Sequence, residues 1–329
     1  MDSSRILIVA PAWIGDLIIS LAFLSALKKI HKNSKIDLLV NENLFDLAKH
    51  FPGISNLIKS RTEHGKLSLL YRIRLGLQLR KNHYTDCYIL TNSFKSSIIP
   101  FIAKIKNRIS YLGEFRYGLV NKIIKSIDRN EGMVNRYLNL IDRTYKNEYK
   151  PKIVSGINEQ QDNSKYGLKG EYIVLCPDAE FGPAKRWPHN KWSDLAMSIQ
   201  DKYQVVFIGL DTAMRVKTKE LITKNCIDLI GKTSLDDVIK ILSQSTCVVA
   251  NDSGLMHIAA ALDKPVVGIY GSSSPEYTPP LQDDDKRALI YENLSCSPCY
   301  KRECPLEHMN CLNNISVEHV KDSILRLVK

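Results

Sequence analysis

The chain has 329 residues, of which 44% are apolar and 25% are charged. This composition is typical of a folded globular protein and excludes a largely disordered chain, and the length favours two domains of about 150 residues each. No run of about 18 uninterrupted apolar residues occurs, which argues against a membrane-spanning helix. The first residues lack the basic region and cleavage site of a secretory signal, so we expect a cytoplasmic protein.

The positive charge of the chain lies in its first half. Residues 1–155 carry 26 Lys and Arg against 12 Asp and Glu, a net charge of +14, whereas residues 156–329 carry 20 against 23, a net charge of −3. A strongly basic half favours an anionic partner, such as nucleic acid, an anionic lipid surface or a phosphorylated substrate. A Lys-rich surface that serves only to keep the protein in solution is the alternative.

Short apolar runs alternate with loops and amphipathic segments along the first half. Residues 5–10 are rich in β-branched side chains, which indicates a buried strand, and a loop and a long apolar helix follow it. The same order of strand, loop and helix then recurs, which predicts a parallel sheet covered by helices on both faces. The expected elements are strands over residues 5–10, 35–40 and 84–91 and helices over residues 17–30 and near 96–104.

A polar stretch without periodicity, residues 146–171, separates this pattern from a second one. We therefore expect a first domain over residues 1–155 and a second over 156–329. Both are expected to be Rossmann-like, doubly wound α/β domains that face each other across a cleft, with residues 317–328 as a closing helix. The other expected elements of the second domain are strands over 172–176, 204–209, 247–250 and 265–270 and helices over 191–203, 235–244 and 255–262.

Three loops between a strand and a helix contain unusual residues. They read PAWIGD (residues 11–16), DAEFGPAKRWP (178–188) and NDSGLMH (251–257). In open α/β sheets, ligands bind beyond the carboxyl ends of the strands, where these loops lie. None of the loops is a Walker A sequence, and no GxGxxG motif occurs, which argues against a P-loop ATPase and a standard dinucleotide fold.

The loop over residues 251–257 has the features of an anion site. Asp252 or Ser253 is able to cap the following helix, and Gly254 leaves the first backbone N–H groups of that helix uncovered. Such N–H groups attract phosphate, and His257 on the first turn is placed to donate to a phosphate or ribose oxygen. A plainly capped helix with an internal histidine is the alternative.

The other two loops also carry residues that are typical of a ligand-binding or catalytic site. Lys185 and Arg186 follow Gly-Pro directly, and two cations before a helix suit a phosphate, although solvated surface charge is the alternative. Asp16 follows Gly15 and opens the first helix. It is either an N-cap or a general base that takes a proton from an acceptor hydroxyl, and Gly15 would allow the substrate to approach closely.

The motifs together resemble those of the heptosyltransferases of bacterial lipopolysaccharide inner-core synthesis, glycosyltransferase family 9. The resemblance spans nearly the whole chain in the order found in the family. The stretches that carry it are PAWIGD (11–16), TNSFKS (91–96), GEFRYGL (113–119), AEFGPAKRWPH (179–189), NDSGLMH with IAAAL (251–262) and YGSSSPEYTPPL (270–281).

This resemblance implies a two-domain glycosyltransferase of the GT-B architecture that inverts the anomeric centre without a metal ion. The second domain would hold ADP-L-glycero-D-manno-heptose, and the first would receive the anionic acceptor heptosyl-Kdo-lipid A at the inner membrane. Asp16 then matches the catalytic base, and Lys185 matches a contact to the donor phosphates. The nucleotide and diphosphate loop matches Asp252, Ser253, Gly254, Leu255 and His257.

The basic first half agrees with a phosphorylated lipid acceptor. The candidates for acceptor contact, besides Gly15, are Lys95, Arg108, Arg116 and Tyr117. The basic and apolar run over residues 67–74 is a candidate for contact with anionic lipid, with an ordinary surface helix as the alternative.

Four of the eight cysteines lie close together near the end of the chain, as Cys296, Cys299, Cys304 and Cys311. Four thiolates at short spacing suit a structural zinc ion or an iron–sulfur cluster, and reduced thiols or a disulfide are the alternatives.

Two other functions remain open from the sequence. One is another heptosyltransferase or nucleotide-sugar glycosyltransferase of the same architecture, because the loops do not define the sugar. The other is a nucleotide-sugar binding protein without turnover. Nucleic acid is disfavoured as a partner, because no recognised motif accompanies the basic positions.

Overall fold

A computed structural model describes residues 4–62, 65–124, 131–142, 150–153, 163–210 and 225–329. The chain divides into two compact units, Met1–Tyr149 (unit 1) and Lys150–Lys329 (unit 2). The predicted boundary after residue 155 lies outside the described residues. No helix in the described part of the chain combines the length and the apolar character needed to cross a membrane.

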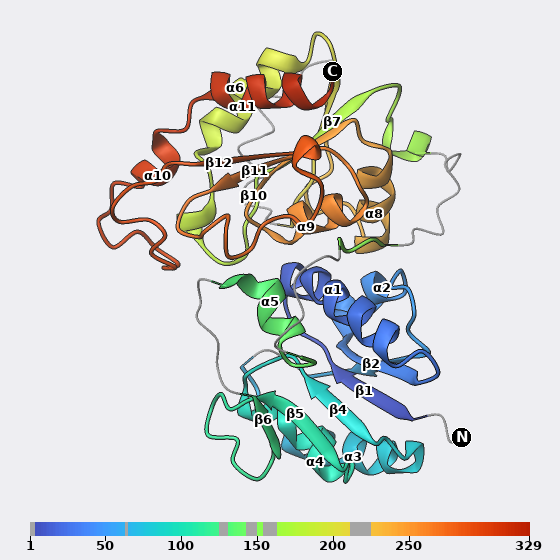
Figure 1. Cartoon of the computed structure of the whole chain (residues 1–329). Coiled ribbons are helices and arrows are strands. Elements are labelled where there is room, and N and C mark those ends of the chain that lie inside the picture. Colours follow the sequence, from blue (N-terminus) through green and yellow to red (C-terminus); the bar gives the residue numbers. More distant parts are fainter. Residues whose placement is uncertain (1–3, 63–64, 125–130, 143–149, 154–162, 211–224) are drawn as a thin grey trace. The chain divides into compact units, whose positions relative to one another are not determined.

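Unit 1 is built on a six-stranded parallel sheet with the order β3-β2-β1-β4-β5-β6 (Figure 1). Helices α1 and α5 pack together on one face, and α3 and α4 pack together on the other. The strands are β1 (Arg5–Val9), β2 (Lys35–Asn41), β3 (Asn56–Ser60), β4 (Asp86–Ile89), β5 (Asn107–Tyr111) and β6 (Lys122–Ile124). The helices are α1 (Ile14–Ile30), α2 (Phe45–Ala48), α3 (Leu69–Leu79), α4 (Ile98–Ile102) and α5 (Gly132–Leu138), with short 3-10 helices η1 (Glu42–Leu44), η2 (Arg80–Asn82) and η3 (Phe94–Ser97).

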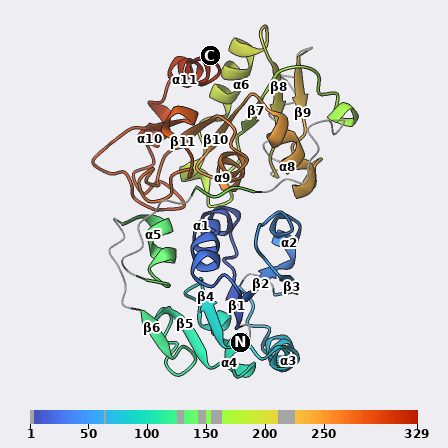
Figure 2. The same ribbon diagram turned by 45° about the vertical axis from the view of Figure 1, so that its right-hand side comes forward.

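Unit 2 repeats this arrangement with the order β12-β11-β10-β7-β8-β9. Helices α6 and α11 pack together on one face, and α8 and α9 on the other (Figure 2). The strands are β7 (Tyr172–Cys176), β8 (Gln204–Phe207), β9 (Cys226–Asp228), β10 (Cys247–Asn251), β11 (Val266–Tyr270) and β12 (Arg287–Tyr291). The helices are α6 (His189–Ile199), α8 (Leu235–Gln244), α9 (Gly254–Ala261), α10 (Asn310–Asn313) and α11 (Val317–Leu327), with 3-10 helices η5 (Asn163–Tyr166), η6 (Pro183–Lys185) and η8 (Asp284–Lys286).

The two doubly wound α/β units confirm the predicted fold class. In each sheet the first strand along the chain lies in the middle, and the order of strands reverses between it and its neighbour. The reversal lies between β1 and β4 in unit 1 and between β7 and β10 in unit 2. Ligands of such sheets bind at this point, beyond the carboxyl ends of the strands. The loops after these four strands are therefore the ones that topology selects for a site.

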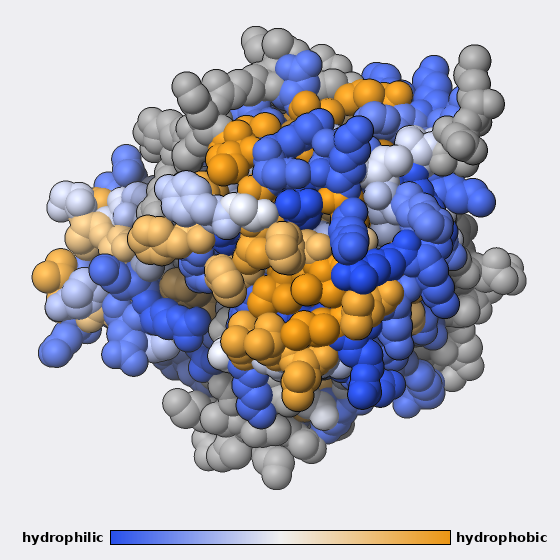
Figure 3. Space-filling view, turned by 90° about the horizontal axis from the view of Figure 1, so that it is seen from below, coloured by the Kyte–Doolittle hydropathy of each residue, from blue (hydrophilic) through white to orange (hydrophobic). Residues whose placement is uncertain are grey.

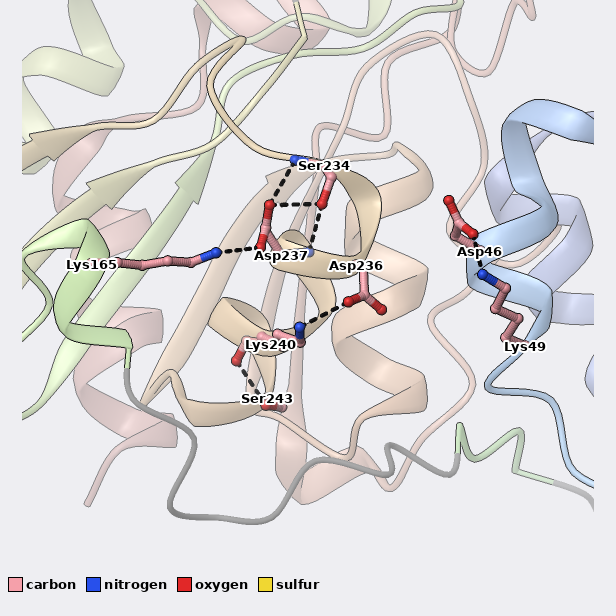
Figure 4. Close-up of polar contacts among 8 residues, drawn as sticks. All are labelled: Asp46, Lys49, Lys165, Ser234, Asp236, Asp237, Lys240 and Ser243. Atoms are coloured by element: carbon pink, nitrogen blue, oxygen red, sulfur yellow. Dashed lines mark hydrogen bonds and ion pairs between the residues drawn. The ribbon is translucent and has the colours of Figure 1, made fainter.

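Local sequence explains how individual elements form. Strands β7 and β10 are buried at every residue, because helices cover both faces of a parallel sheet, and their sequences are accordingly almost wholly apolar. Helix α8 begins at a capping box in which Ser234 and Asp237 each accept a hydrogen bond from the other's backbone N–H (Figure 4). Lys165 adds an ion pair to Asp237 at 2.9 Å.

Candidate active site

The carboxylate of Asp252, directly after β10, is the centre of a buried polar cluster. Its Oδ2 atom accepts hydrogen bonds from Lys185 Nζ and from Ser273 Oγ, each at 2.5 Å. Its Oδ1 atom lies 3.8 Å from His257 Nε2. Asp252 is 5% exposed, and the Lys185 side chain is 17% exposed, so a charged pair is held largely out of water beside the first turn of α9.

The structure does not support a plain cap on helix α9. Ser253 occupies the N-cap position with extended backbone angles, but its side chain makes no capping hydrogen bond. The buried Ser253 Oγ atom has no hydrogen-bond partner among the described residues, and the carboxylate of Asp252 is engaged by Lys185 and Ser273 instead. The first N–H groups of a helix lack intrahelical partners, so this end retains donors for an anion. Gly254 and Leu255 are its first two residues and are partly exposed.

The Lys185 loop is fixed to the core of unit 2 by close backbone approaches. A Cβ atom added at Gly182 would lie 2.5 Å from the carbonyl oxygen of Arg302, so no other residue fits there without moving the backbone. Trp187 is 1% exposed, and its backbone N–H donates to Asn251 Oδ1 at 3.0 Å. The Asn251 amide in turn donates to Pro177 O. Asn251 thus ties the loop after β7 to the loop after β10.

Arg186 is turned toward its own loop in the described structure. Its Nε atom donates to Ala179 O at 3.1 Å, and its Nη2 atom lies 3.7 Å from Asp178 Oδ1. The side chain remains 31% exposed, so it keeps access to solvent next to Lys185. The predicted phosphate contact by Arg186 stays a prediction.

His257 lies one turn into α9 and is almost completely buried. Burial lowers the pKa of its imidazole from 6.5 to about 4, while nearby Asp252 acts in the opposite direction and Lys185 in the same one. The imidazole is therefore neutral at pH 7, and it presents one donor and one acceptor nitrogen to its surroundings. It does not add a second positive charge to the cluster.

In unit 1, Gly15 and Asp16 lie in the first turn of α1. The N-cap of this helix is Trp13, so the N-cap alternative for Asp16 is wrong. The loop that carries Asp16 follows β1 and hence lies at the strand reversal of the unit 1 sheet. The role of Asp16 as a general base stays a prediction.

The acceptor candidates do not all reach the surface at this edge. Lys95 lies in η3 after β4, and Tyr117 is 65% exposed in the loop after β5, so both are accessible beyond the carboxyl ends of strands. Arg108 lies at the start of β5, at the opposite edge of the sheet, and donates to Leu119 O, Ile105 O and Gly118 O. The topology of the sheet does not favour an acceptor contact at Arg108, because ligands of such sheets bind at the carboxyl edge, and this contact stays a prediction.

Arg116 was also predicted to contact the acceptor, and the structure corrects this. The residue is 0% exposed. Its guanidinium donates to three backbone carbonyls and three serine hydroxyls, those of Leu112, Thr91, Tyr111, Ser96, Ser97 and Ser110. Burial lowers the pKa of Arg116 from 12.5 to about 10, which leaves it charged at pH 7. Arg116 holds loops together instead of meeting a ligand.

The four clustered cysteines line one small hollow together with Ala184, next to Lys185, and Ser272, which lies after β11 and next to Ser273. No group of three or more His, Cys, Asp or Glu residues in the described part of the chain is placed to hold a metal ion, so the predicted zinc site is not supported. None of the four thiols forms a disulfide in the described structure. The pKa of the Cys311 thiol is raised, chiefly by burial and to a smaller extent by the other three cysteines. The segment instead supports the site: Tyr300 N–H donates to Ser272 O, and Ala184 N–H donates to Arg302 O.

Comparison with known proteins agrees with the geometry. The model of glycosyltransferase family 9 (heptosyltransferase) matches residues 72–310, and the chain belongs to this family. It is 36% identical over 298 residues to lipopolysaccharide heptosyltransferase 2 of Escherichia coli K12, covering 84% of this chain and 85% of the relative. It is 36% identical over 303 residues to lipooligosaccharide heptosyltransferase 2 of Haemophilus influenzae, covering 85% of this chain and 86% of the relative. The structure of E. coli ADP-heptose LPS heptosyltransferase II matches with a TM-score of 0.84 and 31% identity, over 98% of both chains.

Sequence reasoning missed Ser273 as part of the site and included Asn251 in a candidate loop without giving it a role. Ser273 lies in a run of three serines after β11, where no single serine is distinguished by pattern. Its contact to Asp252 joins residues 21 positions apart. Asn251 stands beside Asp252, and a buried asparagine at a strand end is the signal that would have identified it.

His257 generates a prediction about stability and pH. Its pKa is lower in the folded chain than in the unfolded chain, so between pH 6.5 and about 4 only the unfolded state binds the proton. The free energy of unfolding should therefore fall across this window by roughly 3 kcal/mol more than in His257→Gln, and should be insensitive to His257 above it. Denaturant titrations of both proteins at pH 7 and pH 4.5 measure this. Parallel pH profiles would contradict the neutral assignment.

Arg116→Met should destabilise the protein strongly, because six acceptors lose their donor inside the fold. We expect a loss of roughly 3 kcal/mol or more, which corresponds to a melting temperature lower by about 10 °C. Arg116→Lys should also be less stable than the parent, since one ammonium group cannot make the hydrogen bonds of the planar guanidinium. The exposed Arg74→Met is the control and should change stability by less than about 0.5 kcal/mol. Equal melting temperatures for the two Met variants would refute the structural role.

Proposed function

We propose that this family 9 glycosyltransferase moves L-glycero-D-manno-heptose from ADP-heptose to the heptosyl-Kdo-lipid A acceptor of the lipopolysaccharide inner core. The observation that carries the proposal is the buried Lys185–Asp252–Ser273 cluster beside the uncapped end of α9. The identity to relatives named lipopolysaccharide heptosyltransferase 2 supports the choice of sugar and acceptor.

In this proposal, unit 2 binds the donor at the loops after β7 and β10. The diphosphate of ADP lies against the first N–H groups of α9, at Gly254 and Leu255, which provide donors and the positive end of a helix dipole. Lys185 Nζ exchanges part of its contact with Asp252 for a phosphate oxygen. Ser273 continues to donate to Asp252 and so holds that carboxylate in place while Lys185 moves. His257, being neutral, donates a hydrogen bond without adding charge.

The chemical step is a single displacement with inversion. The Asp16 carboxylate takes the proton of the acceptor hydroxyl, and the hydroxyl oxygen forms a bond to the anomeric carbon of the heptose. The bond from that carbon to the ADP β-phosphate oxygen breaks, and its electron pair leaves with ADP. The products are a protonated Asp16, free ADP and an acceptor longer by one heptose. No enzyme nucleophile takes part, and Asp16 later returns its proton to water.

We propose that no metal ion is needed for this step. Negative charge grows on the departing β-phosphate, and Lys185, Arg186 and the amides of α9 provide the compensating positive charge. Groups that are already oriented in a buried site stabilise such charge without reorganising at the moment of reaction. Lys185 fits this role, because its ammonium group is held in place by Asp252 and lies 5.1 Å from the centre of the Phe181 ring.

Unit 1 receives the acceptor. Lys95 and Tyr117 remain the accessible candidates for contact with its anionic inner-core part, and Gly15 leaves space beside Asp16. Because the acceptor is anchored by acyl chains, we propose that the protein works as a peripheral protein on the cytoplasmic face of the inner membrane. The excess of positive charge in this half supports an anionic membrane as the partner, and we propose no role for nucleic acid.

The direct test is incubation with ADP-heptose and truncated lipopolysaccharide that ends in one heptose, followed by mass spectrometry. The protein should add one heptose. Asp16→Asn should lower the rate of transfer by roughly 100- to 10,000-fold, because an amide cannot accept the proton, and should leave ADP affinity unchanged. The control Asp46→Asn, at the exposed Asp46–Lys49 pair of unit 1 in Figure 4, should transfer normally. Transfer by Asp16→Asn at the parental rate would remove Asp16 from the mechanism.

Lys185→Ala should weaken ADP binding by roughly 10- to 100-fold, the effect of one lost charge-assisted hydrogen bond. Isothermal titration with ADP measures it. Lys240→Ala on α8 is the matched control, since the ammonium group of Lys240 pairs with Asp236 on its own helix at 2.9 Å (Figure 4), and this variant should leave ADP affinity unchanged. Equal affinity of the parent and Lys185→Ala would place the diphosphate elsewhere.

A further inference from the structure

Two buried arginines tie three loops of unit 1 into one surface. Arg72 is 5% exposed and donates from Nε to Leu67 O at 2.7 Å and from Nη1 to Lys95 O at 3.0 Å, so it joins the start of α3 to η3. Arg116 joins the loop after β4 to the loop after β5 through the hydrogen bonds described above. The Phe94 N–H also donates to Glu114 Oε2 at 2.8 Å.

The last two loops also approach each other at the backbone. A Cβ atom added at Gly113 would lie 2.3 Å from the carbonyl oxygen of Asn92, and Gly113 has a φ of +48°, so this contact requires glycine. The three loops are therefore held in a fixed arrangement by backbone contacts and buried guanidinium groups. Their outward side chains form a preorganised surface.

This surface exposes large apolar side chains. Leu70 is 84% exposed and Phe115 is 86% exposed, and four further apolar side chains of the same loops are also exposed. Exposed apolar side chains gathered in one place mark a contact surface, whereas single ones do not. We call this set the apolar rim: Leu67, Leu69, Leu70, Phe94, Phe115 and Tyr117. Figure 3, which views the chain from below, shows that this face of the molecule contains both apolar and hydrophilic side chains.

The charge around the apolar rim is positive. Lys66, Arg74 and Lys95 belong to the segments that carry the apolar rim. The acidic residue of these segments is Glu114, whose carboxylate accepts from the Phe94 N–H. An apolar surface with more cations than carboxylates in its segments is complementary to a bilayer with anionic headgroups, because the apolar side chains enter the acyl boundary while the cations remain at the phosphates.

The position of the apolar rim agrees with this partner. Helix α3 follows β3, and η3 follows β4, so both begin beyond the carboxyl ends of the strands. The loop that carries Phe115 and Tyr117 follows β5 at the same edge. Asp16 also lies at this edge, after β1. Within unit 1, the apolar rim and the candidate base therefore belong to one edge of the sheet.

We propose that the apolar rim inserts into the surface of an anionic lipid bilayer and thereby meets the acceptor where its acyl chains are anchored. The membrane contact stands on the surface of unit 1 alone, and only the identity of the anchored acceptor rests on the proposed function. Lys95 follows Phe94 in the chain, and its backbone carbonyl accepts from Arg72. With the apolar rim inserted, the Lys95 side chain lies at the level of the headgroups.

Flotation of the full chain with lipid vesicles tests the proposal. The protein should float with vesicles of phosphatidylcholine and phosphatidylglycerol, and should float poorly with phosphatidylcholine alone or in high salt. The double variant Leu70→Gln, Phe115→Gln should reduce the bound fraction by roughly 10-fold or more, since it removes the two most exposed apolar side chains. Leu210→Gln is the matched control, because Leu210 is 74% exposed on unit 2, and it should bind like the parent.

Three results would overturn the proposal. The first is equal vesicle binding by the double variant and the parent, and the second is equal binding to neutral and anionic vesicles. The third is a parent that forms dimers which the double variant abolishes, with no vesicle binding by either, because the apolar rim would then contact a second copy of the chain. Both substituted side chains are exposed, so unchanged melting temperatures should show that folding is intact.

A second measurement separates this proposal from the proposed function. With a deacylated, water-soluble acceptor, the double variant should transfer heptose as fast as the parent, while its transfer to acceptor embedded in vesicles should fall. Failure of the parent to transfer to either acceptor would refute the proposed function and leave the vesicle result standing. Slow transfer by the double variant to the soluble acceptor would show that the two side chains serve the acceptor site instead of the bilayer.

Discussion

The whole structure depends on the reversal of strand order in each parallel sheet. In both units the chain starts in the middle of the sheet, and the loops after the two strands at the reversal diverge to opposite faces. That constraint alone selects the loops that carry Asp16, Lys95, Lys185 and Asp252. Their residues are separated by up to 236 positions in the chain. Parallel pairing places the site loops of each unit at one edge, and the side chains then determine the chemistry.

At the carboxyl edge of the unit 2 sheet, the carboxylate of Asp252 holds Lys185 and Ser273 in place. A buried lysine beside helix N–H groups is unfavourable by itself, because both carry positive charge and the lysine has lost water. Asp252 offsets that cost by accepting from Lys185, and Ser273 fixes the carboxylate from a third loop. In the proposed function, a diphosphate brings negative charge to the same place, so it can pair with Lys185 without a net loss of pairing. His257 stays neutral, which keeps the cluster from becoming too positive.

Much of the fold followed from the sequence, because buried parallel strands are apolar throughout and their helices are amphipathic. The expected strand over 172–176 and helix over 235–244 agree with β7 and α8 at both ends. The short strands β3, β5, β6, β9 and β12 were missed, since three to five residues of mixed polarity give no periodicity. Arg116 was misplaced because arginine is usually exposed, and its burial depends on acceptors from several loops that meet only in the fold.

In the proposed function, the unequal charge of the two halves follows from the range over which each half acts. A donor diphosphate is bound in contact, so a few cations and amides at hydrogen-bond distance suffice, and unit 2 can remain nearly neutral. A membrane surface must be approached from solution, where salt screens single charges beyond about 8 Å. Only many cations on one side raise the local potential enough to attract and orient a protein toward anionic lipid. In the proposed function, the net charge of +14 over residues 1–155 and the exposed apolar side chains of unit 1 serve the same membrane contact.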